Sequence, residues 1–179
     1  MKILLDISFL GTAYCGYQVQ PNAPTIQGQL NRASKTIFGF DCDVVGCSRT
    51  DRGVHASQFF VTISKKGEQG IETNIPIDRL PTVFSVYLPQ DISVNSASIV
   101  SDSFHARYDV KYKEYIYRIW NGSIRDPFTY DRSWHYPRYI DDDTIFKMNK
   151  AASHFIGTHD FGAYMAANSN VKKYNKNYL

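Results

Sequence analysis

The sequence predicts an α/β protein built from two similar halves. Residues 2–9 alternate between apolar and polar side chains, as a half-buried strand does, and residues 25–39 carry apolar side chains at helical spacing. The same order of strand, loop and helix recurs over residues 113–156. We therefore expect two α/β domains, at residues 1–103 and 104–179.

The composition is typical of a globular cytoplasmic protein. The chain has 179 residues, of which 43% are hydrophobic, so it can bury a core of ordinary size. It contains no apolar run near the roughly 18 residues of a membrane span, and Met1-Lys2-Ile3 enters the alternating pattern instead of a signal-peptide core. The odd count of three cysteines argues against a disulfide framework.

The net charge of +3 does not by itself indicate a nucleic-acid-binding protein. Local composition is more informative, because many of the 13 tyrosines are interleaved with Lys and Arg between Arg107 and Arg138. Aromatic rings beside cations suit RNA bases and phosphates. Tyrosine also favours β-strands in proteins that bind no RNA, and both interpretations stay open at this stage.

In the first half, local signals delimit one helix and several strands. The helix should begin after Thr25, a suitable N-cap, and end at Gly39, a suitable C-cap. β-Branched and aromatic residues are dense in the remaining apolar segments, which we therefore expect to be extended. These segments are residues 44–48, 59–64, 83–88 and 92–100.

The second half predicts a strand at residues 113–120 and a helix at residues 141–156. The helix has an acidic first turn, and Gly157 follows its end. Its apolar stripe is Ile145, Met148, Ala152 and Phe155. The first half continues after its helix into two further strands, whereas only a short polar tail follows here. We therefore expect an unpaired sheet edge and an uncovered helix face.

The stretch GCSRTDRGVHA, residues 46–56, connects two predicted strands and holds an aspartate between two arginines. Arg49 and Arg52 favour the charged form of Asp51, since a nearby cation lowers the pKa of a carboxyl group. A charged aspartate can act as a nucleophile or stabilise positive charge that develops in a reaction. The alternative is a structural turn in which the aspartate bonds to nearby backbone.

His55 and two cysteines nearby also allow more than one interpretation. His55 can be a general base or a structural histidine at the start of a strand. Cys42, Cys47 and His55 could supply three metal ligands, but their spacing fits no familiar zinc pattern, and a buried thiol is the ordinary interpretation of Cys47. The residues alone therefore indicate an α/β protein with an ionised aspartate in a loop and a possible RNA partner.

Four sequence blocks carry a resemblance to a known family. In order along the chain they are Gly11 with Tyr14–Gln20, Arg49–Ala56, Phe104–Arg107 and Tyr115–Tyr117. They resemble blocks of the tRNA pseudouridine synthase A family, whose catalytic motif is Arg-Thr-Asp-x-Gly-Val-His-Ala. The chain departs from many relatives at Ser48, where they carry Gly, and at Arg52, where they carry Ala.

The resemblance implies isomerisation of uridine to pseudouridine in the anticodon arm of tRNA, at tRNA positions 38–40, without a cofactor or a metal. Asp51 would act as nucleophile or charge stabiliser on a uridine extruded from its stack. Arg49 would keep Asp51 charged and orient it. Tyr115 would stack on the target base or assist removal of its C5 proton.

The resemblance also implies a fold, partners and further binding residues. The fold would be the pseudouridine synthase fold, two domains with mainly antiparallel sheets covered by helices, with the second domain incomplete here. The partners would be the tRNA anticodon stem-loop and a second copy in a homodimer. The residues expected to bind the RNA are Tyr17, Gln18, Arg52, His55, Phe104, His105 and Arg107.

Two alternatives to an active enzyme follow from the same sequence. One is an RNA-binding remnant of such an enzyme, impaired by truncation or by a frameshift near residue 172, where the tail departs from the family pattern. The other is a structural α/β protein without RNA chemistry, against which the nearly complete Asp51 motif argues.

Overall fold

The computed structural model describes residues 1–165 and 175–178, and the chain divides into two compact units, Met1–Ile116 (unit 1) and Tyr117–Leu179 (unit 2). The mixed α/β class agrees with the sequence prediction. The sequence predicted a domain boundary after residue 103, whereas the two units of the structure divide after Ile116, so residues 104–116 belong to unit 1. The frameshift expected near residue 172 lies outside the described residues.

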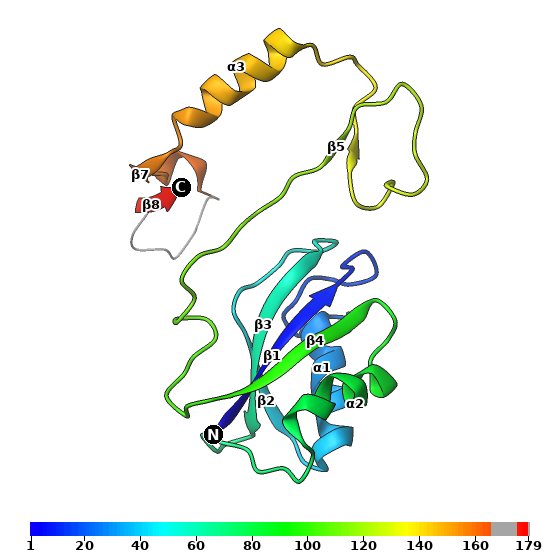
Figure 1. Ribbon diagram of the computed structural model, residues 1–179, viewed down its shortest axis with the longest axis vertical. Coiled ribbons are helices and arrows are strands. Elements are labelled where there is room, and N and C mark those ends of the chain that lie inside the picture. Colours follow the sequence, from blue (N-terminus) through cyan, green and yellow to red (C-terminus); the bar gives the residue numbers. More distant parts are fainter. Residues whose placement is uncertain (166–174, 179) are drawn as a thin grey trace. The chain divides into compact units, whose positions relative to one another are not determined.

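Unit 1 is a four-stranded antiparallel sheet with two helices against one of its faces (Figure 1). The strand order is β2-β3-β1-β4, so β1 lies inside the sheet and β2 and β4 form its edges. The strands are β1 (Lys2–Phe9), β2 (Cys42–Gly46), β3 (Ala56–Lys65) and β4 (Ile92–Val100). The helices are α1 (Ile26–Phe38) and α2 (Leu80–Tyr87), the latter preceded by a 3₁₀ turn at Ile77–Arg79.

The first strand and the first helix confirm the predictions made from periodicity and capping. Every second side chain of β1, from Ile3 to Phe9, is buried. Thr25 is the N-cap of α1, because its hydroxyl oxygen accepts a hydrogen bond from the Gly28 N–H at 3.2 Å. Gly39 closes the helix with a φ of +78°, in the left-handed region that glycine adopts without strain.

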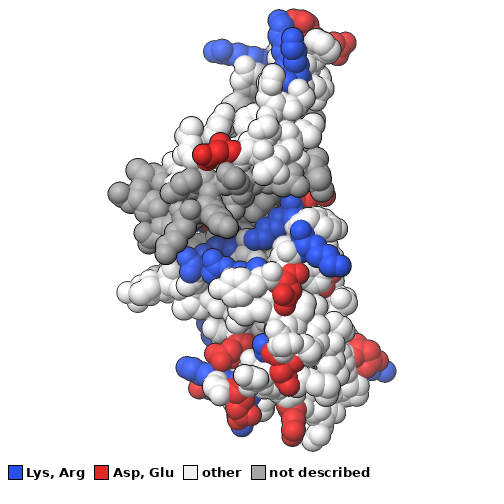
Figure 2. All heavy atoms as spheres, turned by 90° about the vertical axis from the view of Figure 1, so that its left-hand side faces the viewer, with Lys and Arg blue, Asp and Glu red and all other residues white. Residues whose placement is uncertain are grey.

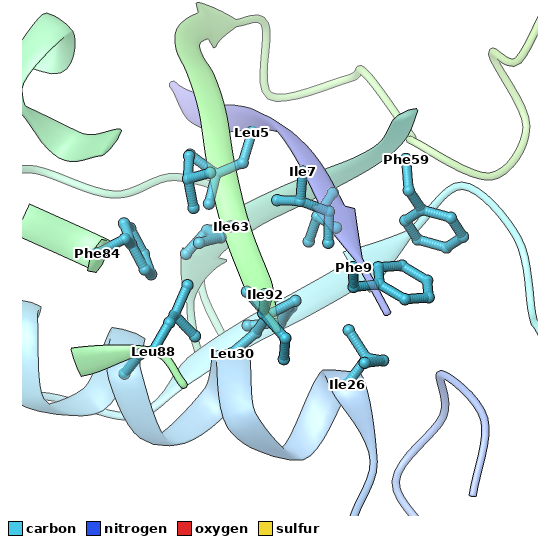
Figure 3. Close-up of a cluster of buried hydrophobic side chains, with 14 of the residues drawn as sticks. Leu5, Ile7, Phe9, Ile26, Leu30, Phe59, Ile63, Phe84, Leu88 and Ile92 are labelled. Carbon is cyan, nitrogen blue, oxygen red and sulfur yellow. The ribbon is translucent and has the colours of Figure 1, made fainter. Parts of the chain in front are cut away.

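The core of unit 1 lies between the sheet and the two helices, where side chains of the strands and of both helices point toward one another (Figure 3). Ile26 and Leu30 of α1 and Phe84 of α2 are fully buried there. The sheet side chains that face them include Leu5, Ile7, Phe9, Phe59, Ile63 and Ile92. This packing fixes both ends of the connection between β2 and β3, which carries the candidate site.

The extended segment predicted at residues 83–88 is wrong, because those residues belong mostly to helix α2. Its sequence is rich in β-branched and aromatic residues, which favour strands locally. Leu80 and Phe84, however, are four residues apart and fully buried, so a helix places both side chains in the core. Pro81 lies in the first turn, where its missing N–H is not needed.

Unit 2 contains short elements in pairs. A parallel pair joins β5 (Ile119–Trp120) and β6 (Trp134–His135), and an antiparallel pair joins β7 (Gly157–Asp160) and β8 (Asn175–Tyr178). The helix is α3 (Asp142–Ser153), and a 3₁₀ turn follows at Gly162–Tyr164. The strand predicted at residues 113–120 is wrong except for β5, because no neighbouring strand in the described part of the chain pairs with residues 111–118.

Helix α3 confirms the predicted second helix, although its apolar stripe is not buried. The Asp141 carboxylate accepts a hydrogen bond from the Thr144 N–H at 2.8 Å and so caps the helix. Ile145 and Met148 remain 47% and 50% exposed, in agreement with the expected uncovered helix face. Among the helices of residues 1–165, none has the length and hydrophobicity needed to cross a membrane.

Candidate active site

The Asp51 loop, residues 47–55, joins the two neighbouring antiparallel strands β2 and β3, as the sequence predicted. At its start the Cys47 N–H donates to the Phe60 carbonyl oxygen at 2.8 Å. At its end the Val54 N–H donates to the Asp51 carbonyl oxygen at 3.2 Å, and Gly53 supplies the positive φ of +79° in that turn. The turn therefore places Asp51 at a defined position between two strands.

A second loop holds the Asp51 loop from both sides of Asp51. We call residues 10–20 the clamp loop. The Tyr17 N–H donates to the Thr50 carbonyl oxygen at 3.2 Å, and the Gly53 N–H donates to the Tyr14 carbonyl oxygen at 3.3 Å. Thr50 is one residue before Asp51 and Gly53 is two residues after it. The two bonds therefore hold the backbone on both sides of Asp51.

Two glycines of the clamp loop make this approach possible. A Cβ added at Gly16 would lie well under 3.0 Å from the Thr50 carbonyl oxygen, and the φ of Gly16 is +85°. A Cβ added at Gly11 would overlap the Val54 carbonyl oxygen. Any side chain at either position would push the two loops apart, so the loops can meet only with glycine there.

The Asp51 side chain itself is exposed. Within residues 1–165 and 175–178, its carboxylate accepts no hydrogen bond and forms no salt bridge. A turn held by a hydrogen bond of the Asp51 side chain therefore does not describe this loop. Arg49 and Arg52 are exposed as well, and the bond expected between Arg49 and Asp51 stays a prediction for the RNA-bound protein.

Tyr17, which the resemblance places among the RNA-binding residues, is a core residue in this structure. It is 3% exposed, and its ring centroid lies 4.7 Å from that of Phe59. A Cβ at Gly46 would lie 2.5–2.7 Å from the Tyr17 ring, so the ring packs directly on the end of β2. Burial raises the pKa of its phenol above the ordinary value. The neighbouring Gln18, in contrast, is exposed.

His55 connects the Asp51 loop to the clamp loop. Its Nδ1 accepts a hydrogen bond from the Gly11 N–H at 3.0 Å. A ring nitrogen that accepts carries no proton, so this geometry requires the neutral imidazole. The sequence left open a general base or a structural histidine, and this hydrogen bond between the two loops supports the structural histidine.

Of the two cysteines considered as ligands, Cys47 is buried and Cys42 is half-buried. Burial raises the pKa of Cys42 to about 11, and burial also raises the pKa of Cys47. For Cys47 this agrees with the buried thiol expected from the sequence. Across the described residues, no three His, Cys, Asp or Glu side chains lie close enough together to hold a metal ion.

The segment that follows β4 supplies the remaining predicted residues. Phe104 packs against the core, and its carbonyl oxygen accepts a hydrogen bond from Lys2 Nζ at 3.0 Å. The ring of His105 lies 4.3 Å from that of Tyr108. Arg107 is exposed, whereas Ala106 beside it is buried and anchors the segment to unit 1.

Lys113 links this segment to the Asp51 loop. Its Nζ donates to the Ser48 hydroxyl oxygen at 3.2 Å. Tyr115 lies two residues beyond and is 81% exposed. In the part of the chain that the structure describes, no hydrogen bond joins Tyr115 to Asp51, the two predicted catalytic residues.

Charges on the face of unit 1 that Figure 2 shows do not form a single-sign field. In Figure 2, acidic and basic side chains are interspersed over the lower end of that view, which belongs to unit 1. This agrees with the small net charge of +3. The cations Arg49, Arg52 and Lys113 lie in or next to the Asp51 loop.

One residue pair that supports the site, Tyr14 and Asp91, was not predicted from the sequence. The hydroxyl of Tyr14, a residue that is 4% exposed, donates to Asp91 Oδ1 at 2.6 Å. Asp91 lies just before β4 and is 77 residues from Tyr14. No local periodicity signals a contact at such a separation, although the glycines on both sides of Tyr14 mark its loop as a place of close backbone approach.

Curated proteins named tRNA pseudouridine synthase A are similar to most of the chain. The relative from Aquifex aeolicus is 39% identical over 89% of this chain and 63% of its own length. Those from Caldicellulosiruptor saccharolyticus and Staphylococcus saprophyticus are 39% and 37% identical over 94% and 96% of this chain, and 65% and 61% of their own lengths. The chain thus spans less than two thirds of these relatives. No family model matches the chain.

Proposed function

Because the chain belongs to the tRNA pseudouridine synthase A family, we propose that it isomerises uridine to pseudouridine in the anticodon arm of tRNA, with Asp51 as the reacting carboxylate. The observation that carries this proposal is the exposed side chain of Asp51 on a loop whose backbone the clamp loop holds on both sides. The cytoplasm is the compartment in which we propose that it acts.

The proposed reaction exchanges one bond of the nucleotide for another. The bond between N1 of uracil and C1′ of ribose breaks, the uracil turns, and a bond forms between C5 and C1′. C5 loses its proton and N1 gains one, so the atoms of the nucleotide balance without a second substrate. When the N1–C1′ bond breaks, positive charge develops at C1′ of the ribose, and a carboxylate can attack or stabilise that position.

Asp51 suits this task in two respects. Its exposure lets a uridine extruded from the anticodon loop reach the carboxylate. The hydrogen bonds at Thr50 and Gly53 hold the backbone in place before the substrate arrives, so less ordering is left for the reaction step. We propose that Asp51 either attacks the nucleotide or stabilises the charge that forms when the glycosidic bond breaks.

Residues around Asp51 would bind and orient the RNA. Arg49 would pair with Asp51 once RNA is bound and keep its carboxylate charged, and Arg52 would contact a phosphate. Tyr115, with its exposed ring, would stack on the target base or accept its C5 proton. The exposed side chains of Gln18 and Arg107 and the half-buried rings of Phe104 and His105 would line the path of the anticodon stem-loop.

The family resemblance extends the proposal to assembly. We propose that the active form is a homodimer that binds the tRNA anticodon stem-loop. Sedimentation of the purified protein with and without tRNA measures both associations. A protein that stays a monomer while it turns over substrate would remove the homodimer from the proposal.

The experiment that tests the function is pseudouridine formation in unmodified tRNA, mapped by nucleotide position. We expect signal in the anticodon arm with the natural sequence and none with Asp51→Asn, which removes the charge with little change of shape. Asp78→Asn, at an exposed aspartate of the 3₁₀ turn before α2, is the matched control and should retain full signal. Tight tRNA binding without any pseudouridine would favour the RNA-binding remnant instead.

A further inference from the structure

We propose that Tyr14 and Asp91 form a positioning pair that holds the Asp51 loop in its reactive geometry. This inference rests on the proposed function above. Tyr14 bonds to Asp91 and to the Asp51 loop. Its hydroxyl donates to Asp91 Oδ1 at 2.6 Å, and its carbonyl oxygen accepts from the Gly53 N–H at 3.3 Å. Gly53 is two residues after Asp51, so a single residue joins Asp91 to the loop that carries the reacting group.

The hydrogen bond between Tyr14 and Asp91 has the features of a strong one. Its length of 2.6 Å lies in the range of hydrogen bonds between a hydroxyl and a charged carboxylate. Burial is the larger cause and the hydrogen bond from its hydroxyl to Asp91 the second cause that raise the pKa of Tyr14 above the ordinary phenol value. The hydroxyl therefore keeps its proton, and with it the bond, across the whole range of pH in which an RNA enzyme works.

Asp91 holds the clamp loop at two points. Its side chain accepts from the Tyr14 hydroxyl, and its backbone carbonyl accepts from the Leu10 N–H at 2.9 Å. Between these points the Tyr14 N–H donates to the Gly11 carbonyl oxygen at 2.9 Å and closes a turn. The start of β4 thus fixes both ends of the segment that contacts the Asp51 loop at Gly53 and at His55.

A purely structural role for the pair would have different consequences. The turn that leads into β4 is closed by the backbone bond from the Ile92 N–H to the Pro89 carbonyl oxygen, which does not use the Asp91 side chain. The ring of Tyr14 can stay buried without its hydroxyl. Removing the hydroxyl should therefore loosen the Asp51 loop and slow the reaction step while the core and the RNA affinity persist.

The first readout is amide hydrogen exchange at Gly53, which needs no enzymatic activity. In Tyr14→Phe we expect the Gly53 amide to exchange at least about tenfold faster, since its acceptor loses the bond that anchors it, whereas the amides of β1 and β3 keep their protection. Tyr87→Phe, at an exposed tyrosine of α2, is the matched control and should change neither. Unchanged exchange at Gly53 in Tyr14→Phe would overturn the proposal.

The second readout is turnover of tRNA. We expect kcat to fall by about 10- to 100-fold in Tyr14→Phe and in Asp91→Ala, with KM within about twofold of the natural protein. Asp91→Asn keeps an acceptor for the Tyr14 hydroxyl, although the hydrogen bond is then between neutral groups. Its loss of kcat should therefore be smaller than that of Tyr14→Phe or Asp91→Ala. Asp78→Asn again controls for the loss of a surface charge.

Combined outcomes separate this inference from the proposed function. Faster Gly53 exchange together with the graded loss of kcat supports both. A rise in KM with an intact kcat would overturn the positioning role even if the protein is a synthase. A natural protein that forms no pseudouridine while Gly53 exchange responds to Tyr14→Phe would refute the proposed function and leave the pair as the anchor of the loop.

Discussion

The substitution Gly16→Ala should slow the proposed reaction by displacing the Asp51 loop. A Cβ at this position would lie closer than 3.0 Å to the Thr50 carbonyl oxygen, whereas ordinary Cβ contacts begin at 3.4 Å. The two loops must therefore separate by at least 0.4 Å, the difference of 3.4 and 3.0 Å. Since a misplacement of about 1 Å can cost on the order of 100-fold in rate, we expect a loss of about tenfold or more in kcat.

Gly39→Ala is the matched control for this substitution. Gly16 and Gly39 have similar φ values of +85° and +78°, but no atom lies within 4 Å of a Cβ at Gly39. Both variants should share the backbone strain of about 1–2 kcal/mol, and Gly16→Ala alone adds the clash with the Thr50 carbonyl oxygen. Only Gly16→Ala should lower the single-turnover rate of pseudouridine formation. A natural rate in Gly16→Ala, or an equal loss of rate in Gly39→Ala, would show that the contact between Gly16 and Thr50 does not position the Asp51 loop.

Four further predictions concern caps, a surface link and salt. Thr25→Ala should lower the free energy of unfolding of unit 1 by about 1 kcal/mol, measured by denaturant titration, because α1 loses its N-cap. Ser48→Gly removes the exposed bond to Lys113 and should cost less than about 1 kcal/mol by the same titration. The hydrogen bonds from Thr144 lower the pKa of Asp141 below its ordinary value of 3.8, so its stabilisation of α3 is complete above that pH and is lost as the pH falls through the lowered pKa. Circular dichroism should show this loss of helix, and Asp141→Asn should lack that part of the pH dependence. Affinity for tRNA, measured by filter binding, should fall steeply with salt, since phosphate contacts release counterions; a flat response would contradict an RNA site.

Local sequence signals were sufficient for the elements that local physics determines. The alternation of β1 and the caps of α1 at Thr25 and Gly39 depend on neighbours in sequence, and both predictions are confirmed. They were insufficient for α2, because the burial of Leu80 and Phe84 against a sheet assembled from distant segments outweighs the strand preference of its residues. A strand at residues 113–118 would need a partner strand, which a local pattern cannot supply.

The construction of the candidate site could not be predicted from the sequence. The resemblance of the motif around Asp51 proposes which carboxylate reacts, and that role stays a prediction. The clamp loop, the role of His55 as an acceptor for Gly11 and the contact of Tyr14 with Asp91 became visible only in three dimensions. The burial of Tyr17 shows the same limit, since an aromatic residue in a loop next to a catalytic motif is compatible with RNA stacking until its neighbours are known.

Release of tritium from tRNA that carries uridine labelled at C5 tests the central claim most directly, because the label leaves only when C5 becomes bonded to C1′. We would measure it under single-turnover conditions with the protein in excess over tRNA, for the natural sequence, Asp51→Asn and Asp78→Asn. We expect tritium release with the natural sequence and with Asp78→Asn, and none with Asp51→Asn, while all three bind tRNA alike. Release that persists in Asp51→Asn would contradict the role given to Asp51.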